Sequence, residues 1–255
     1  MSHLSCGIVG LPNVGKSTLF NALLKRQIAD VAPYPFTTIK PHTGVVEVPD
    51  NKLDKLCKLI DPGKCIPAIV TFIDIAGLVK NAHKGEGLGN EFLGQIRNVD
   101  AIVHVIRKFE SKSVTHVMGS IDPERDKEII NIELELGGIK KPTIEWVNSD
   151  KKDFENVDEL IKKAYKLLDL ITFYTVKGGK EVRGWAIKDG SSAIEAAEKV
   201  HTDFAKNFIK AEVVNVDELL KAGSWKGAKE KGKLRLEGKD YVVQDRDVIE
   251  FKVGT

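Results

Sequence analysis

Residues 10–17 read Gly-Leu-Pro-Asn-Val-Gly-Lys-Ser, which matches the pattern G-x-x-x-x-G-K-[ST]. In this pattern the glycines let backbone N–H groups wrap around phosphate oxygens, the lysine reaches the β- and γ-phosphates, and the serine hydroxyl binds Mg²⁺. A helix that begins here directs the positive end of its dipole at the same phosphates. The alternative is a glycine-rich turn with a purely structural role. The motif therefore predicts a nucleotide-binding loop with contacts from Asn13, Val14, Gly15, Lys16, Ser17 and Thr18.

Five short apolar segments have the composition of buried strands. They are residues 4–10, 45–48, 68–75, 101–106 and 143–147. Because near-continuous apolar strands that alternate with helical stretches are typical of parallel sheets covered on both faces, these segments predict an α/β fold. The chain is 42% apolar, which excludes wholesale disorder. No apolar run reaches eighteen residues, so no membrane span is expected.

A helix is expected to begin at residues 122–123, with Asp122 as the N-cap and proline in the first turn. Ile129, Ile132 and Leu136 then fall on one helical face. Gly137-Gly138 is expected to end this helix.

The sequence pattern changes after about residue 168, where we place a domain boundary. Residues 171–187 read as a β-hairpin, and Ser192 with Glu195 forms a capping box for a helix through Phe208. Short strands are expected at residues 211–214, 234–236, 241–243 and 248–253. The sequence therefore predicts a nucleotide-binding domain over residues 1–168, which ends in an amphipathic helix, and a compact α+β domain over residues 169–255.

Two further elements are candidates for the phosphate site. Asp74-Ile-Ala-Gly77 follows the third expected strand, where an aspartate holds Mg²⁺ through water and a glycine N–H senses the γ-phosphate. Thr38 lies between the two motifs, where a switch loop supplies a threonine to the metal. The alternatives are an aspartate turn at the end of a strand and an ordinary loop threonine. The candidate metal ligands are therefore Ser17, Thr38 and Asp74.

Longer stretches of the chain resemble one known family. GLPNVGKSTLFNAL, YPFTT, DIAGLV, KGEGLGNEFL and IRNVDAIVHVIR are similar to the Obg-related translation-factor GTPases, and among them to the Obg-like ATPase (YchF) family. HTDFAKNFIKAEVV and GKLRLEGKDYVVQDRDVIEF resemble the C-terminal TGS domain of that family, a ubiquitin-like β-grasp module. The resemblance implies a P-loop NTPase that prefers ATP and associates with ribosomes, with the large subunit as the expected partner.

The residue after Gly77 is Leu78, where many GTPases carry a glutamine that orients the attacking water. Because leucine cannot hydrogen-bond to water, slow turnover is expected unless another group acts; the family also carries a hydrophobic residue there. His83 is the candidate for orienting water or contacting a partner, and the alternative is an exposed loop histidine. Asn13 resembles an asparagine that helps to bind K⁺ in related GTPases, and the alternative is a turn-favouring asparagine. The candidate catalytic residues are Lys16, Thr38, Gly77 and His83.

The chain departs from this family in two places. The family's long helical insertion is reduced here to the expected helix near residues 122–140, and five strands are expected where the family has six. After the fifth strand the family has N-x-x-E and a GTPase has N-K-x-D, whereas this chain reads Asn148-Ser149-Asp150-Lys151. Asn148 remains a candidate for hydrogen bonding to a purine, or it simply ends a strand. The glutamate of the family's N-x-x-E pattern, which favours ATP over GTP, is therefore missing from this chain.

The net charge is only +2, but basic residues gather towards the C-terminus. Residues 221–239 contain seven Lys or Arg against two Glu, a local charge of +5, with Trp225 among them. Basic residues beside an aromatic ring can meet RNA phosphates and stack on a base. The alternative is a solvated lysine-rich loop.

The three cysteines, Cys6, Cys57 and Cys65, lack metal-ligand spacing, and they are expected to stay reduced in a cytoplasmic protein. The expected function is that of a slow Mg²⁺-dependent NTPase, with K⁺ as a further candidate cation, which hydrolyses ATP or also GTP and binds ribosomes. One alternative is a nucleotide-binding scaffold with negligible hydrolysis, whose output is interaction through the C-terminal domain. Another is a chain too shortened to fold its nucleotide domain.

Overall fold

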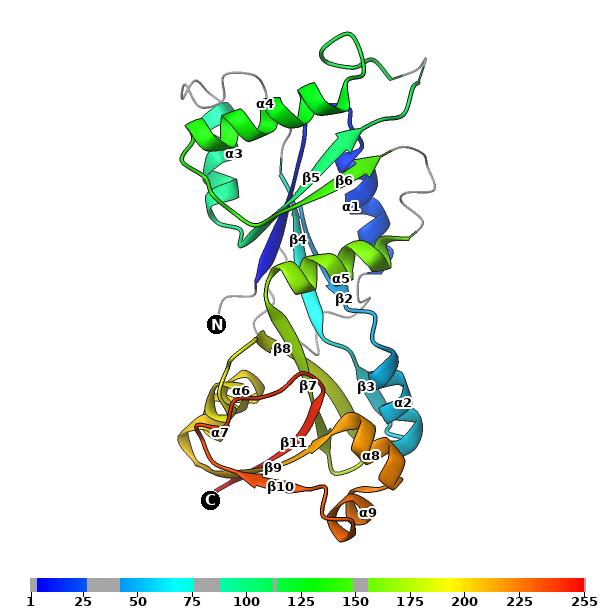
Figure 1. Ribbon diagram of the computed structural model, residues 1–255, viewed down its shortest axis with the longest axis vertical. Coiled ribbons are helices and arrows are strands. Elements are labelled where there is room, and N and C mark those ends of the chain that lie inside the picture. The colour runs from blue at the N-terminus through cyan, green and yellow to red at the C-terminus, as the bar shows by residue number, and fades with distance from the viewer. Residues whose placement is uncertain (1–3, 27–41, 76–87, 112–113, 149–155, 255) are drawn as a thin grey trace. The chain divides into compact units, whose positions relative to one another are not determined.

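The computed structural model describes residues 4–26, 42–75, 88–111, 114–148 and 156–254 (Figure 1). The chain divides into two compact units. One comprises residues 2–47 and 70–168, and the other comprises residues 48–69 and 169–255 together with Met1. Each unit is built around its own β-sheet.

The first unit contains a five-stranded sheet with the order β2-β4-β1-β5-β6. Its strands are β1 (Ser5–Val9), β2 (Thr43–Glu47), β4 (Ile69–Asp74), β5 (Ala101–Arg107) and β6 (Thr143–Asn148). β1 pairs in parallel with β4 and β5, and β5 pairs in parallel with β6. Every residue of β1 and β5 is buried, as central strands covered on both faces require. The five predicted strands and the α/β class are confirmed.

Helices cover both faces of this sheet. Those described are α1 (Lys16–Leu24), α3 (Leu88–Arg97), α4 (Pro123–Leu136) and α5 (Val157–Leu167). α1 packs against α5, while the end of α4 lies against α3, where Arg97 donates to the Gly137 carbonyl at 3.1 Å. Figure 1 shows α3 and α4 together on one side of the sheet and α1 and α5 on the other.

α4 begins and ends where the sequence predicts. The Asp122 side chain accepts a hydrogen bond from the Arg125 backbone N–H at 3.1 Å, and proline occupies the first turn. The helix ends at Gly137, and Gly138 follows with a φ of 67°, which favours glycine. The predicted N-cap and stop are therefore confirmed.

The apolar face that the sequence predicts for α4 is not the buried face of this helix. Ile132 and Leu136 are 45% and 58% exposed, whereas Ile130 and Leu134 are buried. The buried side of the helix also carries two acidic residues, Asp126 and Glu133. An apolar repeat therefore cannot identify this face, because half of the buried positions are polar.

The second unit contains a six-stranded sheet with the order β10-β9-β11-β7-β8-β3. Its strands are β3 (Lys64–Ile66), β7 (Leu170–Lys177), β8 (Glu181–Lys188), β9 (Phe208–Asn215), β10 (Arg235–Glu237) and β11 (Asp247–Val253). β7 and β8 form the predicted hairpin, and β11 lies between β7, to which it is parallel, and β9, to which it is antiparallel. A hairpin, a helix and this mixed strand order agree with the predicted β-grasp architecture.

The helix after the hairpin is shorter than predicted. Ser192 and Glu195 form the expected capping box, but α6 (Ala193–Val200) ends at His201, whose extended backbone separates it from α7 (Thr202–Lys206). The imidazole of His201 accepts the Asp203 backbone N–H at 3.1 Å and so caps the second helix. The predicted strand at residues 241–243 forms only a single bridge, from Val242 to Ser192.

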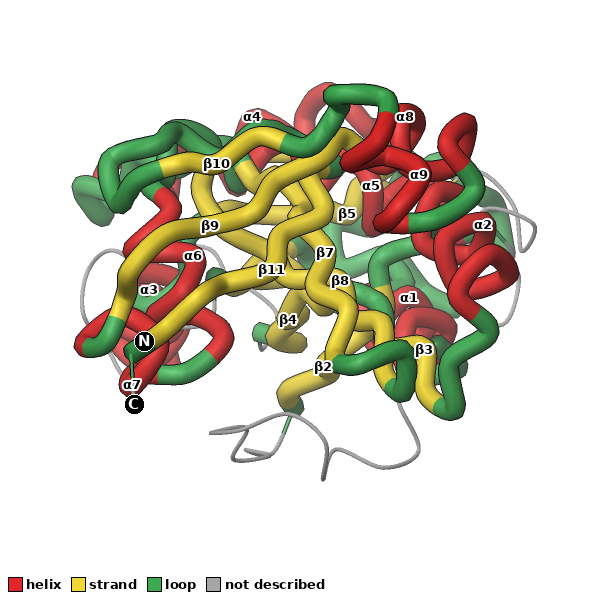
Figure 2. The backbone as a smooth tube through the Cα atoms, turned by 90° about the horizontal axis from the view of Figure 1, so that it is seen from below, coloured by secondary structure: helices red, strands yellow, loops and turns green. Residues whose placement is uncertain are grey.

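Residues 48–69 fold with the second unit, which the predicted boundary at residue 168 did not anticipate. This segment contains α2 (Asn51–Ile60) and β3, and β3 joins the sheet edge beside β8. Leu53 and Leu56 of α2 enter a buried cluster with Tyr174 and Val214 of the sheet. α8 (Val216–Ala222) and α9 (Trp225–Glu230) complete this cluster, and Figure 2 shows them beside α2. The β-grasp sheet therefore has a second covered face, opposite the one that α6 covers.

Two of the cysteines form a disulfide, contrary to the prediction that all stay reduced. Cys57 of α2 is bonded to Cys65 of β3, and their Cα atoms lie 6.1 Å apart. Cys6 is free and buried, and burial raises the pKa of its thiol to about 12. The pairing was missed because the count and spacing of cysteines do not reveal that residues 57 and 65 turn back on one another.

Candidate nucleotide-binding site

Residues 10–17, the P-loop, connect β1 to α1, as the sequence predicts. Gly10 passes so close to β5 that an added Cβ would lie 2.6 Å from the Val105 carbonyl oxygen. Gly15 is the N-cap of α1 with a φ of 105°, a backbone conformation that favours glycine. Both glycines of the motif are thus required by the geometry of the loop.

Lys16 folds back over the P-loop. Its Nζ donates to the carbonyl oxygens of Gly10 and Leu11 at 3.1 and 2.9 Å, and the residue is only 9% exposed. Burial lowers the pKa of this amine to about 8, against the opposing influence of the Asp74 carboxylate. The ammonium group is therefore held within the loop by weak neutral acceptors, which phosphate oxygens can replace.

Ser17 and Asp74 meet at the mouth of the P-loop. The Ser17 hydroxyl donates to the Asp74 Oδ2 at 3.3 Å, although the two residues are 57 positions apart in sequence. Ser17 stands in the first turn of α1, and Asp74 is the last residue of β4. Thr18 is exposed on the same turn of α1, whereas Val14 is buried in the loop. The structure brings together the two predicted metal ligands that it describes.

Asn148 reaches the P-loop from the end of β6. Its Nδ2 donates to the Val14 carbonyl oxygen at 2.8 Å, and both residues are 1% exposed. The Oδ1 of the same side chain is buried and has no hydrogen-bond partner within the described part of the chain. A buried acceptor without a partner is costly, so this atom is suited to receive a donor from a ligand.

Asn13 contributes to the loop through both its backbone and its side chain. Its φ of 63° is unusual for a residue other than glycine but is tolerated by asparagine. Its Nδ2 donates to the Thr115 carbonyl at 3.1 Å, and its carbonyl oxygen accepts from Arg107 at 3.3 Å. Arg107 is not among the site residues that the sequence predicts, although it is the last residue of the family-like stretch IRNVDAIVHVIR.

Several predicted site residues lie outside the described residues. These are Thr38, Gly77, Leu78 and His83, together with Ser149, Asp150 and Lys151. No group of three or more His, Cys, Asp or Glu that could hold a metal occurs among the described residues.

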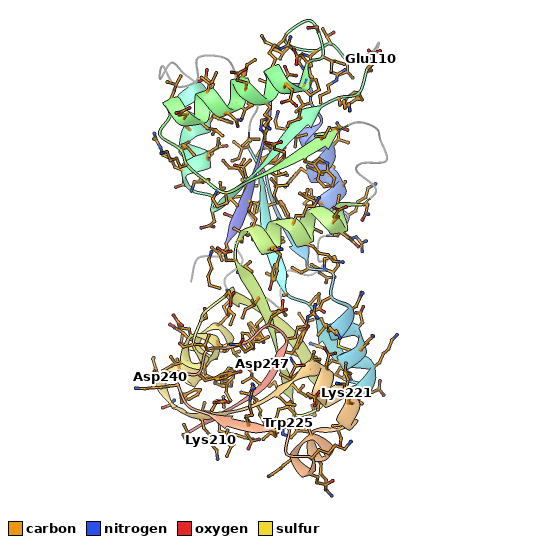
Figure 3. The ribbon with its side chains drawn as sticks, viewed as in Figure 1. Glu110, Lys210, Lys221, Trp225, Asp240 and Asp247 are labelled. Atoms are coloured by element: carbon orange, nitrogen blue, oxygen red, sulfur yellow. A yellow bond between two sulfur atoms is a disulfide. The ribbon has the colours of Figure 1, made fainter. Side chains whose placement is uncertain are left out.

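The basic segment at residues 221–239 spans α8, α9 and β10 of the second unit. Trp225, labelled in Figure 3, is half-buried. It packs against the cluster that contains Leu53 and Leu56, so its ring is not freely available to stack on a base. Part of the positive charge is paired: Glu218 forms ion pairs with Lys221 and Lys233, both at 3.0 Å. The exposed lysines 229, 231 and 239 have no carboxylate partner among the described residues.

Comparison with known proteins places this geometry in a family. A model described as a 50S ribosome-binding GTPase matches residues 5–149, and a model named YchF-GTPase_C, described as a protein of unknown function, matches residues 170–254. A ribosome-binding ATPase YchF from Haemophilus ducreyi is 38% identical over 358 residues, which covers 97% of this chain and 98% of that protein. The chain belongs to the YchF family.

Two further YchF proteins agree with this assignment. The ribosome-binding ATPase YchF of Bacillus subtilis is 38% identical, with 98% of this chain and 99% of that protein covered. The solved structure of the Schizosaccharomyces pombe YchF GTPase superposes with a TM-score of 0.82 at 29% identity, covering 99% of this chain and 98% of the other. These values confirm the predicted family and the P-loop fold.

The YchF alignments also bear on the predicted missing segments. The alignment to the H. ducreyi protein extends over 358 residues, whereas this chain has 255. That relative therefore carries internal segments without a counterpart here. In this chain α4 is followed by only six residues, 137–142, before β6 begins.

Among the described residues, no helix has both the length and the apolar character needed to cross a membrane.

Proposed function

We propose that this YchF-family chain is a Mg²⁺-dependent ATPase that cleaves the β–γ phosphoanhydride bond and binds ribosomes. The observation that carries the proposal is the P-loop itself, in which Lys16 is held by two neutral carbonyls while Ser17 and Asp74 meet beside it. This is the arrangement that phosphate and a hard cation require. The names of the bacterial relatives, which describe ribosome-binding ATPases, support it.

The Asn148 side chain favours adenine over guanine as the base. A carbonyl oxygen can only accept, so the amide nitrogen must face Val14, and Oδ1 is the atom left for the ligand. The 6-amino group of adenine would donate to this oxygen, whereas O6 of guanine would oppose it with a second acceptor. Asn148 therefore supplies a preference for ATP even though the family's acidic residue is replaced by Lys151.

Ser17 and Asp74 fit a magnesium ion. Their side-chain oxygens lie within 3.3 Å of each other at the exposed mouth of the P-loop, and Mg²⁺ prefers oxygen ligands with retained waters. Ser17 would bind the ion directly, Asp74 would bind it through water, and Thr38 would add a third oxygen. Magnesium, when bound, neutralises charge on the β- and γ-phosphates. Asn13 keeps its Oδ1 free of any hydrogen bond within the described residues, so it remains our candidate for a K⁺ ligand.

The protein residues would stabilise a loose transition state rather than supply a strong base. The P-loop N–H groups and Lys16 hold the phosphates, and Gly77 would sense the γ-phosphate through its N–H. Leu78 cannot orient water, so we assign that role to His83, and we expect slow turnover until a partner orders the loops.

The ribosome is the partner that we propose, with the large subunit as the contact. The description of the family model that matches residues 5–149 supports this choice. Within the second unit, the exposed lysines 229, 231 and 239 would contact ribosomal RNA through phosphates. Ribosome binding also implies a cytoplasmic protein.

The proposal is tested by measuring phosphate release from ATP and from GTP, each with and without purified large ribosomal subunits. We expect faster hydrolysis of ATP than of GTP and stimulation by the subunits, with the protein sedimenting together with them. Tight ATP binding without any turnover in either condition would instead support a nucleotide-binding scaffold. Failure to bind either nucleotide would support the third alternative, a chain too shortened to fold its nucleotide domain.

A further inference from the structure

Arg107 is the largest fully buried side chain among the described residues, at 1% exposure. It is the last residue of β5, and its charge is permanent because the guanidinium does not lose its proton in proteins. A buried charge of this kind is costly unless its N–H donors are satisfied. The acceptors of these N–H groups therefore indicate the role of the side chain.

The guanidinium donates to three backbone carbonyl oxygens. Nε donates to Phe109 at 3.1 Å, and one terminal nitrogen donates to Val114 at 3.0 Å. The other terminal nitrogen donates to Asn13 of the P-loop at 3.3 Å. The centroid of the Phe109 ring also lies 4.2 Å from the guanidinium carbon. One side chain thus joins the P-loop to the segment that follows β5, which we define as residues 109–111 and 114–116.

A second tie joins the same two parts. The Asn13 side chain donates to the Thr115 carbonyl at 3.1 Å. His116 then anchors this segment to α4, since its Nε2 lies 2.8 Å from the Asp126 carboxylate and both side chains are 3% exposed. The segment is therefore held at one end by the P-loop and at the other by α4.

The contact with Asn13 acts on the nucleotide site through peptide geometry. The Asn13 carbonyl and the Val14 N–H belong to one planar trans peptide group, so they point in opposite directions. Holding the oxygen against Arg107 directs the Val14 N–H away from Arg107. On the next peptide group, Asn148 holds the Val14 carbonyl in the same manner. Two consecutive peptide groups of the P-loop are thus oriented from outside by side chains.

We propose that Arg107 is a positioning residue for nucleotide hydrolysis, which sets the orientation of the Asn13–Val14 peptide group and couples it to the segment after β5. The proposal rests on the ATPase function proposed above. Its distinguishing consequence is that a change at Arg107 affects phosphate binding and turnover, and not only the stability of the fold.

The test compares Arg107→Lys with Arg125→Lys. Lysine keeps the charge but has a single nitrogen, which cannot reach three separate carbonyls. Arg125 is the matched control because its guanidinium bonds to Ser120 in the connection between β5 and α4 and to Asp126 of α4, without a hydrogen bond to the P-loop. Single-turnover hydrolysis at saturating ATP, ADP affinity and the melting temperature are measured for both variants.

We expect Arg107→Lys to lower the single-turnover rate and the ADP affinity by about tenfold, at a temperature where the protein is fully folded. Arg125→Lys is expected to stay within about twofold of the unmodified protein in both measurements. Equal losses in the two variants, or no loss in Arg107→Lys, would overturn the inference. If Arg107→Lys does not fold, Arg107→Gln, which keeps an amide donor, is compared in its place under the same criteria.

The outcome also separates this inference from the proposed function. If the unmodified protein binds ADP but does not hydrolyse ATP, the ATPase proposal fails. The ADP affinity of Arg107→Lys then decides the positioning role alone: a loss of about tenfold supports it, and an unchanged affinity contradicts it.

Discussion

The Asn148 amide nitrogen donates to the Val14 carbonyl oxygen at 2.8 Å, and this bond joins the end of β6 to the P-loop. The two residues are 134 positions apart in sequence, and both are buried. The contact leaves Oδ1 as an acceptor without a partner in the described part of the chain, and thereby links the position of the P-loop to the choice of base.

Asn148→Asp should weaken ATP binding by about tenfold to a hundredfold, because it removes the amide donor and places a carboxylate against the Val14 carbonyl. The unmodified protein should bind ATP more tightly than GTP, and the variant should keep this preference, because a carboxylate oxygen still accepts from the 6-amino group of adenine and opposes O6 of guanine. Isothermal titration with both nucleotides measures the effect. Asn98→Asp, an exposed position outside the site, is the control and should bind as the unmodified protein does. Equal affinity of the unmodified protein for ATP and GTP would contradict the assigned role of Oδ1.

ADP affinity should fall as the pH rises above about 8. Burial lowers the pKa of the free Lys16 amine to about 8, whereas bound phosphates favour the ammonium form and raise this pKa. Below pH 8 the lysine is already charged, so binding costs no protonation. Above it, each pH unit should weaken binding by up to about tenfold, until the pKa of the complex is reached.

Lys16→Arg provides the control for this pH effect. Arginine stays protonated throughout the range, so the variant should bind ADP more weakly but without the decline above pH 8. Fluorescence titration of a labelled ADP between about pH 7 and pH 9.5 covers the transition. A flat profile for the unmodified protein would show that Lys16 does not change its charge on binding.

Reduction of the Cys57–Cys65 disulfide should destabilise the second unit by about 2–3 kcal/mol, as expected for a loop closed over a sequence separation of eight. The bond holds α2 to β3, and α2 contributes Leu56 to the core of the β-grasp sheet. Thermal unfolding with and without dithiothreitol measures the change. In a Cys57→Ser, Cys65→Ser variant the reductant should have no effect. If the unmodified protein melts at the same temperature in both conditions, the disulfide does not contribute to stability.

Lys229→Glu together with Lys231→Glu should weaken binding to ribosomes and reduce its salt dependence, because each phosphate contact releases counterions. Both lysines are exposed and lack a carboxylate partner among the described residues, so the change breaks no ion pair within them. Lys177→Glu with Lys188→Glu at the ends of the hairpin gives a matched change of charge. Co-sedimentation at increasing salt distinguishes the pairs, and an equal loss for both would refute a specific role for residues 221–239.

The parts of the fold that could be predicted from sequence are those that local chemistry specifies. The conformation of the P-loop backbone requires glycine at positions 10 and 15, and the buried strands beside the loop are largely apolar. The cap at Asp122 and the hairpin at residues 170–188 follow from short patterns as well.

The parts that could not be predicted depend on contacts between distant residues. Residues 48–69 carry a helix that looks like any amphipathic helix. Its packing in the cluster that contains Val214 and the pairing of β3 with β8 assign this segment to the second unit. The sequence around Arg107 does not indicate that its side chain is buried or that it donates to three carbonyl oxygens. The same holds for α4, in which acidic residues occupy half of the buried positions. The apolar pattern therefore identified Ile132 and Leu136 as one face, although both are exposed.

The most direct test of the account is the rate of ATP hydrolysis by the unmodified protein and by Lys16→Ala, measured in the presence of ribosomes. Lys16 is the cation that the P-loop holds at the phosphate site, so its removal should reduce hydrolysis by at least about a hundredfold while the fold survives. A rate that is the same in both proteins would contradict the account, because the hydrolysis would then not arise from the P-loop.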